Sequence, residues 1–390
     1  MNYIKKILSL AFLFVFSQVF SQKEPWPVLK HYDKDHVHNI ALPIGGIGTG
    51  TISLGGIGDL RDWNIMNKPA NGGTVTSSTN TSPFFAIYTK PEGSEAKYKY
   101  GNDPDGRVVN NHGLPRFSEA SFDAAYPFGQ VNLSDSNMPV DVKIKAFNPF
   151  IPANLDDSGI PIFILRYEVK NTTDKNIEVS VCGSILNVID HDGAAENRNQ
   201  YKDQNGLKGI FMYNTEKNSG KRTWGTMALA TSENENVSYA TSLSVPKAPR
   251  DMHEFWEDFS ADGILSEKEF ETGDVRRASL AVKKVIAPGE TKEFQFYLTW
   301  HFPNRKAWDS DETVGNFYTT QYQDAWDVFI QTQPNIPVLE KKTLDFVSTF
   351  LDTDVSEVVK EAALFNMSTL RTETCFRTSD GMFYGWEGIN

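Results

Sequence analysis

Residues 42–67 read LPIGGIGTGTISLGGIGDLRDWNIMN, and the interpretation of the whole chain starts from them. Seven of the fourteen residues from Gly45 to Gly58 are glycine, which indicates close backbone packing or positive φ angles. A nucleotide-binding loop is disfavoured because no Gly-Lys-Ser/Thr follows and because G-x-G-x-x-G would need glycine at Thr51. The isoleucines and leucines between the glycines disfavour a flexible linker. The stretch therefore predicts a buried turn-strand-turn that ends in Arg61-Asp62-Trp63-Asn64.

The first 22 residues have the plan of a secretory signal peptide. Lys5 and Lys6 precede the apolar residues 7–16, and the small Ser21 lies near the expected cleavage site. That apolar run is too short to span a bilayer, and no later segment reaches the required ~20 residues. We expect residues 1–22 to be removed and the protein to be exported to the periplasm or the extracellular space, without an integral membrane segment.

The charge and the cysteine count restrict the partners. Removing Lys5 and Lys6 leaves 36 basic against 50 acidic residues, a net charge of −14. Nucleic acid and anionic membranes are therefore disfavoured, and a neutral ligand is favoured. The two cysteines, Cys182 and Cys375, cannot form a disulfide framework in so long a chain. Export would allow one bridge between them, but we expect them to stay unpaired. No Cys/His cluster has zinc spacing, so we expect neither a metal nor another cofactor.

The middle of the chain predicts an antiparallel β-sandwich. Residues 140–147 alternate apolar and polar side chains at period two, and similar segments recur with turn residues between them. The expected strands are residues 84–88, 140–147, 162–169, 177–182, 226–231, 237–243, 278–285 and 293–300. Together with the strand of the glycine stretch, about nine strands indicate a large sandwich. Residues 90–116 are expected to form a long surface excursion, and residues 253–259 a short helical turn.

After Pro303 the apolar period becomes helical. Residues 317–330, 337–351 and 355–370 predict helices, and Val355, Val358, Val359 and Ala362 line one face of the last. Asp354 with Glu357 resembles a capping box. Residues 372–390 are turn-rich and contain no predicted element that would close a domain. Three helices with unpaired apolar faces make us expect a truncated second domain, with domains at residues 23–305 and 306–390.

Few residues suggest chemistry by themselves. Glu387 lies between Trp386 and Gly388, and Trp386 could desolvate it or form the floor of a sugar site. Asp59 and Asp62 with Arg61 could hold a ligand, although such pairs more often pin a turn. Asp190 and Asp192 have the spacing of part of a Ca²⁺ loop, but the remaining ligands are missing. No serine lies in a G-x-S-x-G elbow.

Several motifs together resemble glycoside hydrolase family 116, the family of non-lysosomal β-glucosylceramidases and their bacterial relatives. The resemblance rests on LPIGGIGTGTISLGGIGDLRDWNI and on four later groups of motifs, in the expected order. These are residues 147–152 (FNPFIP) with 157–161 (DSGIP), 300–304 (WHFPN), 315–318 (GNFY) and 324–326 (DAW). The resemblance implies an N-terminal β-sandwich followed by an (α/α)6 barrel, of which this chain would contain only the first helices.

The resemblance also implies a retaining β-glycosidase acting on β-linked glucose or a similar sugar in a carbohydrate or glycoconjugate. Such enzymes use a nucleophilic carboxylate and an acid/base carboxyl roughly 5 to 5.5 Å apart. Residues 383–388 (FYGWEG) are similar to the motif of the family's nucleophile, which makes Glu387 the candidate. The acid/base aspartate would lie beyond residue 390, so the chain alone is expected to be inactive. The alternative is a non-catalytic carbohydrate-binding sandwich, and a structural sandwich without a ligand also stays open.

Overall fold

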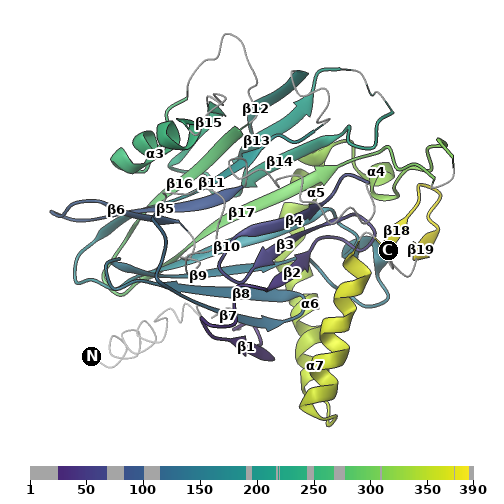
Figure 1. Cartoon of the computed structure of the whole chain (residues 1–390), viewed down its shortest axis with the longest axis horizontal. Helices are drawn as coiled ribbons and strands as arrows, with labels where there is room; N and C mark the ends of the chain where they lie inside the picture. The colour runs from purple at the N-terminus through teal and green to yellow at the C-terminus, as the bar shows by residue number, and fades with distance from the viewer. Residues whose placement is uncertain are drawn as a thin grey trace, which may run out of the picture.

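The computed structural model describes residues 25–67, 83–100, 115–189, 196–216, 218, 220–243, 250–267, 277–307, 310–372 and 374–385. The predicted signal peptide, residues 1–22, lies outside the described residues. Most of the regular secondary structure in the described chain is β-strand in large antiparallel sheets, with a few helices at the periphery (Figure 1).

The largest sheet has nine strands, all antiparallel to their neighbours. Its central pair is β10 with β17, where Ile164 lies opposite Tyr297. The order across the sheet is β1 (Lys30–Tyr32), β7 (Glu119–Ala125), β8 (Phe128–Ser134), β9 (Val140–Phe147), β10 (Ile162–Asn171), β17 (Thr291–His301), β14 (Thr226–Thr231), β13 (Leu207–Asn214) and β12 (Asn197–Gln204).

Two smaller sheets lie against the nine-stranded sheet. The five-stranded sheet has the order β15 (Val237–Leu243), β16 (Arg277–Ile286), β11 (Ile177–Leu186), β5 (Phe84–Pro91) and β6 (Lys97–Tyr100). The glycine stretch supplies the three-stranded sheet of β2 (Ala41–Ile44), β3 (Thr51–Gly55) and β4 (Leu60–Asn64). The prediction of one strand there was incomplete, since three form.

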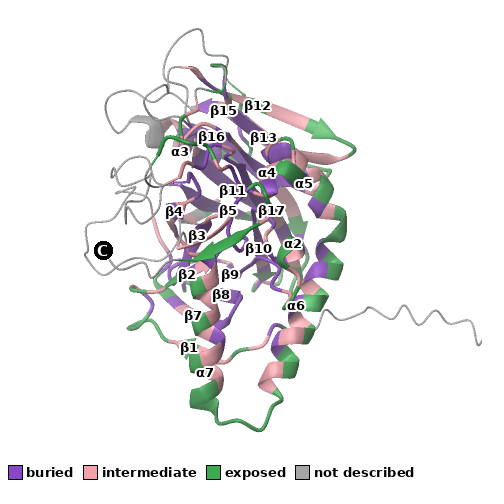
Figure 2. Cartoon of the chain, turned by 90° about the vertical axis from the view of Figure 1, so that its right-hand side faces the viewer, coloured by how far each residue is buried: buried purple, intermediate pink, exposed green. Residues whose placement is uncertain are grey.

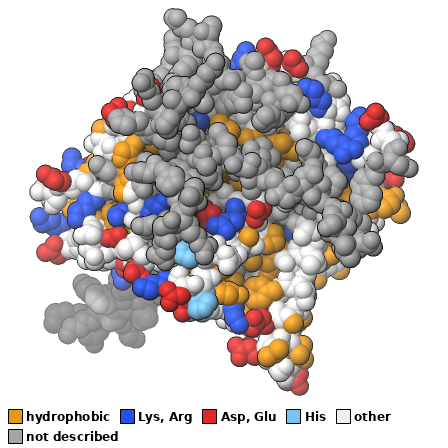
Figure 3. All heavy atoms as spheres, viewed as in Figure 1, with side chains coloured by type: hydrophobic (Ala, Val, Ile, Leu, Met, Phe, Trp, Pro, Cys, Tyr) orange, Lys and Arg blue, Asp and Glu red, His pale blue; other side chains and the backbone are white. Residues whose placement is uncertain are grey.

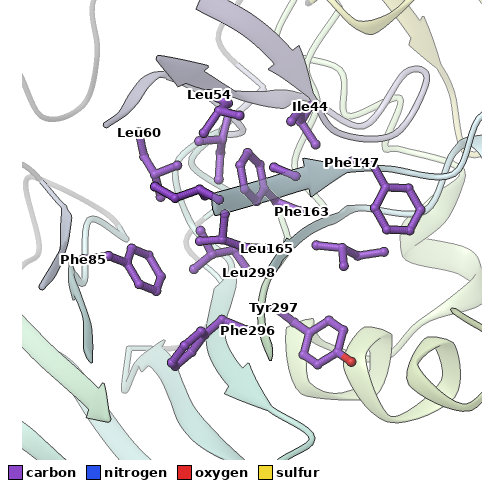
Figure 4. Packing of buried hydrophobic residues seen from close by; sticks show 14 of the residues in the cluster. Ile44, Leu54, Leu60, Phe85, Phe147, Phe163, Leu165, Phe296, Tyr297 and Leu298 are labelled. Atoms are coloured by element: carbon purple, nitrogen blue, oxygen red, sulfur yellow. The ribbon is translucent and has the colours of Figure 1, made fainter. Parts of the chain in front are cut away.

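The core lies between these sheets, as period-two alternation requires. Phe85 of β5 stacks on Tyr167 of β10 with ring centroids 5.2 Å apart, and it meets the edge of Phe296 of β17. Beside them, Leu54 and Leu60 lie toward Phe163 and Leu165 of β10 (Figure 4). All eight predicted strand segments are strands, so the predicted β-rich class with large antiparallel sheets is confirmed.

Helices cover the outer faces of both large sheets. On the five-stranded sheet, α3 (Arg250–Asp262) packs Phe255 and Phe259 against Phe84 and Tyr88. The predicted helical turn at residues 253–259 is thus part of a longer helix. On the nine-stranded sheet, α5 (Ala325–Thr332) places Phe329 against Tyr297, with centroids 5.0 Å apart.

The first predicted helix, residues 317–330, is broken in two. It forms α4 (Tyr318–Gln321) and α5, separated by the extended residues Tyr322 and Asp324. Asp324 is the N-cap of α5, and its side chain accepts a hydrogen bond from the Asp327 N–H at 2.8 Å. The chain therefore starts a new helix at the Asp324 cap, although the apolar period continues through residues 317–330.

The second predicted helix is confirmed as α6 (Ile336–Leu351), which has Pro337 in its first turn. The third is α7 (Glu357–Asn366), followed by the 3₁₀ turn η3 (Met367–Arg371). The capping box of Asp354 with Glu357 was wrong, because Ser356 occupies the N-cap position and makes no side-chain cap bond.

The apolar face predicted for the last helix does not join the core. Val358 is 76% exposed, Val359 is 51% exposed and Val355 is 42% exposed. Leu364 is buried instead. In Figure 2, α7 is largely exposed or half-buried, and Figure 3 shows hydrophobic side chains among charged ones in that region.

Both cysteines are free thiols, as predicted. Cys182 is buried beneath α3, and this burial raises the pKa of its thiol. Among the described helices, none is both long and apolar enough to cross a membrane.

Candidate functional site

The glycine stretch is glycine-rich because other backbone presses on it. A Cβ atom added at Gly46 would lie 2.6 Å from the carbonyl oxygen of Ile160. One added at Gly48, where φ is +74°, would lie 2.9 Å from the backbone nitrogen of Arg377. The loop between β2 and β3 is therefore held between the 155–160 segment and the chain that follows η3. The sequence-based prediction of a tightly packed, buried turn is confirmed.

Two hydrogen bonds fix this loop to the sandwich. The indole N–H of Trp300, near the end of β17, donates to the carbonyl oxygen of Thr49 at 2.6 Å. The backbone N–H of Ile47 donates to the carbonyl oxygen of Ser158, in the short helix α2 (Leu155–Ser158), at 2.8 Å. Motifs that are far apart in sequence therefore meet at this loop.

A buried polar network ties the end of the glycine stretch to the segment after β17. Asn67 donates to the carbonyl oxygen of Phe302 at 2.9 Å and accepts a 2.6 Å bond from Asn316. Asn316 in turn accepts from the Nε of Arg305 at 2.8 Å. The Arg305 guanidinium lies over the ring of Phe376, 4.7 Å from its centroid. Through Phe376, this network supports an element near the end of the described chain.

That element is a hairpin of β18 (Cys375–Arg377) and β19 (Phe383–Gly385). Two cavities lie beside it. Arg377 lines one of about 170 Å³, together with Thr49, Asp156 and Tyr318. Phe376 and Thr378 line the other, of about 750 Å³. Since alternate residues of a strand point to opposite faces, β18 separates the two cavities.

The charged groups of the smaller cavity already have partners. Arg377 donates to Asp156 at 2.6 Å and to the carbonyl oxygen of Gly381 at 3.1 Å, and its guanidinium lies 3.5 Å from the ring centroid of Phe317. Ligand-binding clefts commonly measure roughly 300 to 1,000 Å³. The smaller cavity is below this range and the larger one is within it. The larger cavity is therefore the better candidate for a ligand.

His301, at the end of β17 and behind the smaller cavity, gives a pH-dependent prediction. Its Nε2–H donates to the carbonyl oxygen of Tyr322 at 3.0 Å, and burial lowers the pKa of the imidazole. The unfolded chain, with a histidine pKa of about 6.5, therefore takes up a proton before the folded chain does. We expect the free energy of unfolding to decrease as the pH falls below about 6.5, as measured by urea unfolding at pH 7 and pH 5.

The variant His301→Gln should reduce that pH dependence. The control is His36→Gln. The hydrogen bond with Asp33 raises the pKa of the exposed His36, so replacing His36 should not reduce the loss of unfolding free energy at low pH. If the free energy of unfolding changed equally between pH 7 and pH 5 in the wild type and in His301→Gln, the prediction would be wrong.

Asp59 and Arg61 of the glycine stretch have a structural role. Arg61 forms an ion pair with Asp59 at 2.6 Å and donates to the carbonyl oxygen of His38 at 3.2 Å. Asp59 also packs over Gly55, where a Cβ atom would overlap its carboxylate. These contacts pin the turn, as such pairs commonly do. Asp62 has a positive φ of 51° within β4 and lines neither cavity.

Four sequence-predicted site residues lie outside the described residues. They are Glu387, its neighbour Trp386, and the pair Asp190 and Asp192. Within the described ranges, no group of three or more His, Cys, Asp or Glu side chains is placed to hold a metal ion.

Sequence reasoning missed the hairpin and the lining of the larger cavity. Residues 372–390 were expected to be turn-rich with no element that would close a domain, and no strand was predicted there, yet part of them forms β18 and β19. The available signal was Asp380-Gly381 between two aromatic segments, since Asp-Gly is a strong hairpin turn. Phe376 and Tyr384, which pair across this hairpin, could have been found in that way.

Comparison with known proteins identifies one family. The family described as beta-glucosidase 2, glycosyl-hydrolase family 116 N-term, matches residues 41–336. A comparison with curated proteins finds no match.

The solved structures that are similar in part include the following three. A bacterial glucoamylase complexed with acarbose has a TM-score of 0.44 and 10% identity, over 91% of this chain and 42% of that one. A protein described as a kojibiose phosphorylase from the human microbiome has a TM-score of 0.40 and 10% identity, over 86% of this chain and 39% of that one. A polysaccharide lyase has a TM-score of 0.35 and 8% identity, over 70% of this chain and 33% of that one. The chain spans less than half the length of each, and such low scores indicate no function.

Proposed function

Because this chain belongs to glycosyl-hydrolase family 116, whose N-terminal region matches its residues 41–336, we propose that it contributes to an exported retaining β-glycosidase. The substrate would be β-linked glucose or a similar sugar in a carbohydrate or glycoconjugate. The family match is the single observation that carries this proposal. The cavity of about 750 Å³ beside the β18–β19 hairpin is consistent with it.

We divide the chain into a sandwich, residues 23–305, and the first helices of an (α/α)6 catalytic domain, residues 306–390. The change of structure after β17 supports this division, since the segments between His301 and Arg371 that have regular structure are mostly helical. Export is supported by Lys5, Lys6 and the apolar residues 7–16, which have the plan of a signal peptide.

Glu387 is the proposed nucleophile. In a retaining mechanism this carboxylate attacks the anomeric carbon, and a second carboxyl group protonates the leaving oxygen and later activates water. The hairpin that precedes Glu387 in sequence is fixed by Arg305, Arg377 and Gly48, and rigid support is what a precisely positioned nucleophile requires. We assign the second carboxyl group to no residue of this chain.

A fluorinated substrate tests the mechanism and the residue together. The secreted protein that carries this chain is incubated with 2,4-dinitrophenyl 2-deoxy-2-fluoro-β-glucoside, and its peptides are analysed by mass spectrometry. In a retaining enzyme the carboxylate oxygen bonds to the anomeric carbon, dinitrophenolate leaves, and the fluorine slows hydrolysis of the ester. We expect one fluoroglucosyl group on the peptide that contains Glu387 and none on Glu387→Gln.

The matched control is Glu361→Gln, which replaces a glutamate of α7 that pairs with Lys30 and should leave labelling unchanged. A label on another carboxylate would refute Glu387 as the nucleophile. Absence of label, together with absence of turnover of any aryl β-glycoside, would refute the glycosidase proposal. If oligosaccharide binding persisted in that case, the carbohydrate-binding sandwich would be the better assignment.

A further inference from the structure

The larger cavity has an aromatic wall supported from within the fold. Phe376 and Tyr384 are paired across β18 and β19, and their rings stack with centroids 5.5 Å apart and planes 20° apart. Beneath Phe376 lies the buried guanidinium of Arg305, which Asn316 holds in place. Tyr384, at the outer end of this stack, is 45% exposed and lines the cavity. Its ring is therefore supported from below and accessible from above.

The rim of the cavity offers hydrogen-bonding groups of both kinds. The Lys306 ammonium donates to Thr313 Oγ1 at 2.9 Å and to the carbonyl oxygen of Asp311 at 3.0 Å. Asp380 accepts through Oδ1 from the Thr378 hydroxyl at 2.5 Å and from the Met382 N–H at 3.1 Å. The hydrogen bond from Thr378 lowers the pKa of Asp380, which keeps this carboxylate ionised. Among the described residues, no hydrogen bond is made to its Oδ2.

The charge of the rim indicates the class of ligand. Lys306 is the one cation among the described lining residues, and Asp380 and Glu312 are both acidic. An anion would therefore meet a net negative rim, which disfavours phosphate and carboxylate ligands. An aromatic face flanked by hydrogen-bond donors and acceptors suits a neutral polyhydroxylated ring, which has apolar faces and polar edges.

We propose that this cavity is a saccharide subsite in which a neutral sugar ring packs on Tyr384. Its hydroxyl groups exchange hydrogen bonds with Lys306 and with Asp380 Oδ2. The choice of a β-glucoside as the probe rests on the proposed function, whereas the site itself rests on the described side chains.

Isothermal titration calorimetry with cellobiose tests the site. We expect the wild-type chain to bind cellobiose and Tyr384→Ala to bind it roughly 3- to 10-fold more weakly, the effect of losing one aromatic contact. Tyr384→Phe keeps the ring and should retain most of the affinity. The matched control is Phe383→Ala, which removes a ring of similar exposure, 38%, from the opposite face of the same strand. Thermal unfolding of each variant checks that the fold is intact.

The outcomes separate this proposal from the glycosidase proposal. Weaker binding in Tyr384→Ala but not in Phe383→Ala supports the subsite, even if the fluorosugar labels nothing. The subsite is overturned if wild-type protein does not bind cellobiose, or if both alanine variants bind it equally well. If both alanine variants bound cellobiose equally well, labelling of Glu387 would still support the glycosidase proposal, because labelling does not depend on Tyr384.

Discussion

A Gly50→Ala variant is expected to lose roughly 2 to 5 kcal/mol of folding free energy. Gly50 has φ +92°, a conformation that costs an L-residue with a Cβ atom about 1 to 2 kcal/mol. The added Cβ would overlap the carbonyl oxygen of Asn64 and lie 2.9 Å from Cα of Ile65. Both neighbours are backbone atoms of the β4 region, so relief requires the sheet itself to shift, which adds about 1 to 3 kcal/mol. Urea unfolding followed by circular dichroism measures the loss.

Gly289→Ala is the matched control, because Gly289 also has a positive φ, +71°, but a Cβ there would meet nothing within 4 Å. It lies in the turn between β16 and β17, and its replacement should cost only the conformational part, about 1 to 2 kcal/mol. If the two variants lost the same free energy, close backbone packing would not be the reason for glycine at position 50.

Glu340→Ala is expected to cost about 3 kcal/mol, the lower end of the usual effect of breaking a buried pair, because Arg166 would keep its longer ion pair with the half-buried Glu293 at 3.6 Å. Glu340 lies on α6 and receives both guanidinium nitrogens of Arg166, at 2.6 and 2.5 Å, and the indole N–H of Trp26 at 2.8 Å. The side chains of Arg166 and Glu340 are 4% and 12% exposed. The pair joins α6 to the outer face of the nine-stranded sheet, so its loss should also loosen α6.

The next residue provides the control. Lys341 forms an ion pair with Asp345 at 2.8 Å, but both side chains are exposed, and Lys341→Ala should cost less than about 1 kcal/mol. The double variant Arg166→Met, Glu340→Leu removes both charges and should recover much of the stability lost in Glu340→Ala. A double variant no more stable than the single one would show that the cost comes from packing rather than from the buried charge of Arg166.

Strands with strict alternation were predictable, and those with a polar exposed edge were not. Residues 140–147 form β9 with the predicted bounds, because every second side chain must face the core. In contrast, β12 (NRNQYKDQ) is an edge strand whose side chains are mostly half-buried or exposed, so its sequence carries little apolar signal. The pair β7 and β8 was also missed, although Phe122 and Val131 lie buried opposite each other.

The same limit applies to the candidate site. The glycine density predicted that something presses on residues 45–58, but not that the partners are Ile160, Asn64 and Arg377. The larger cavity combines Lys306 with Asp380 and Tyr384, both of which lie more than seventy positions after Lys306 in the chain. No local pattern links such residues.

The β-rich class, the change to helices after residue 303 and the family could all be predicted from the sequence. These follow from short-range periodicity, composition and ordered motifs, which are properties of neighbouring residues. Tertiary structure alone decided that Asp59 and Arg61 pin a turn, that Val358 faces solvent, and that the hairpin forms the wall of a cavity. Each of these depends on which distant segments are brought into contact, and close packing and burial, unlike periodicity, exist only once the chain has folded.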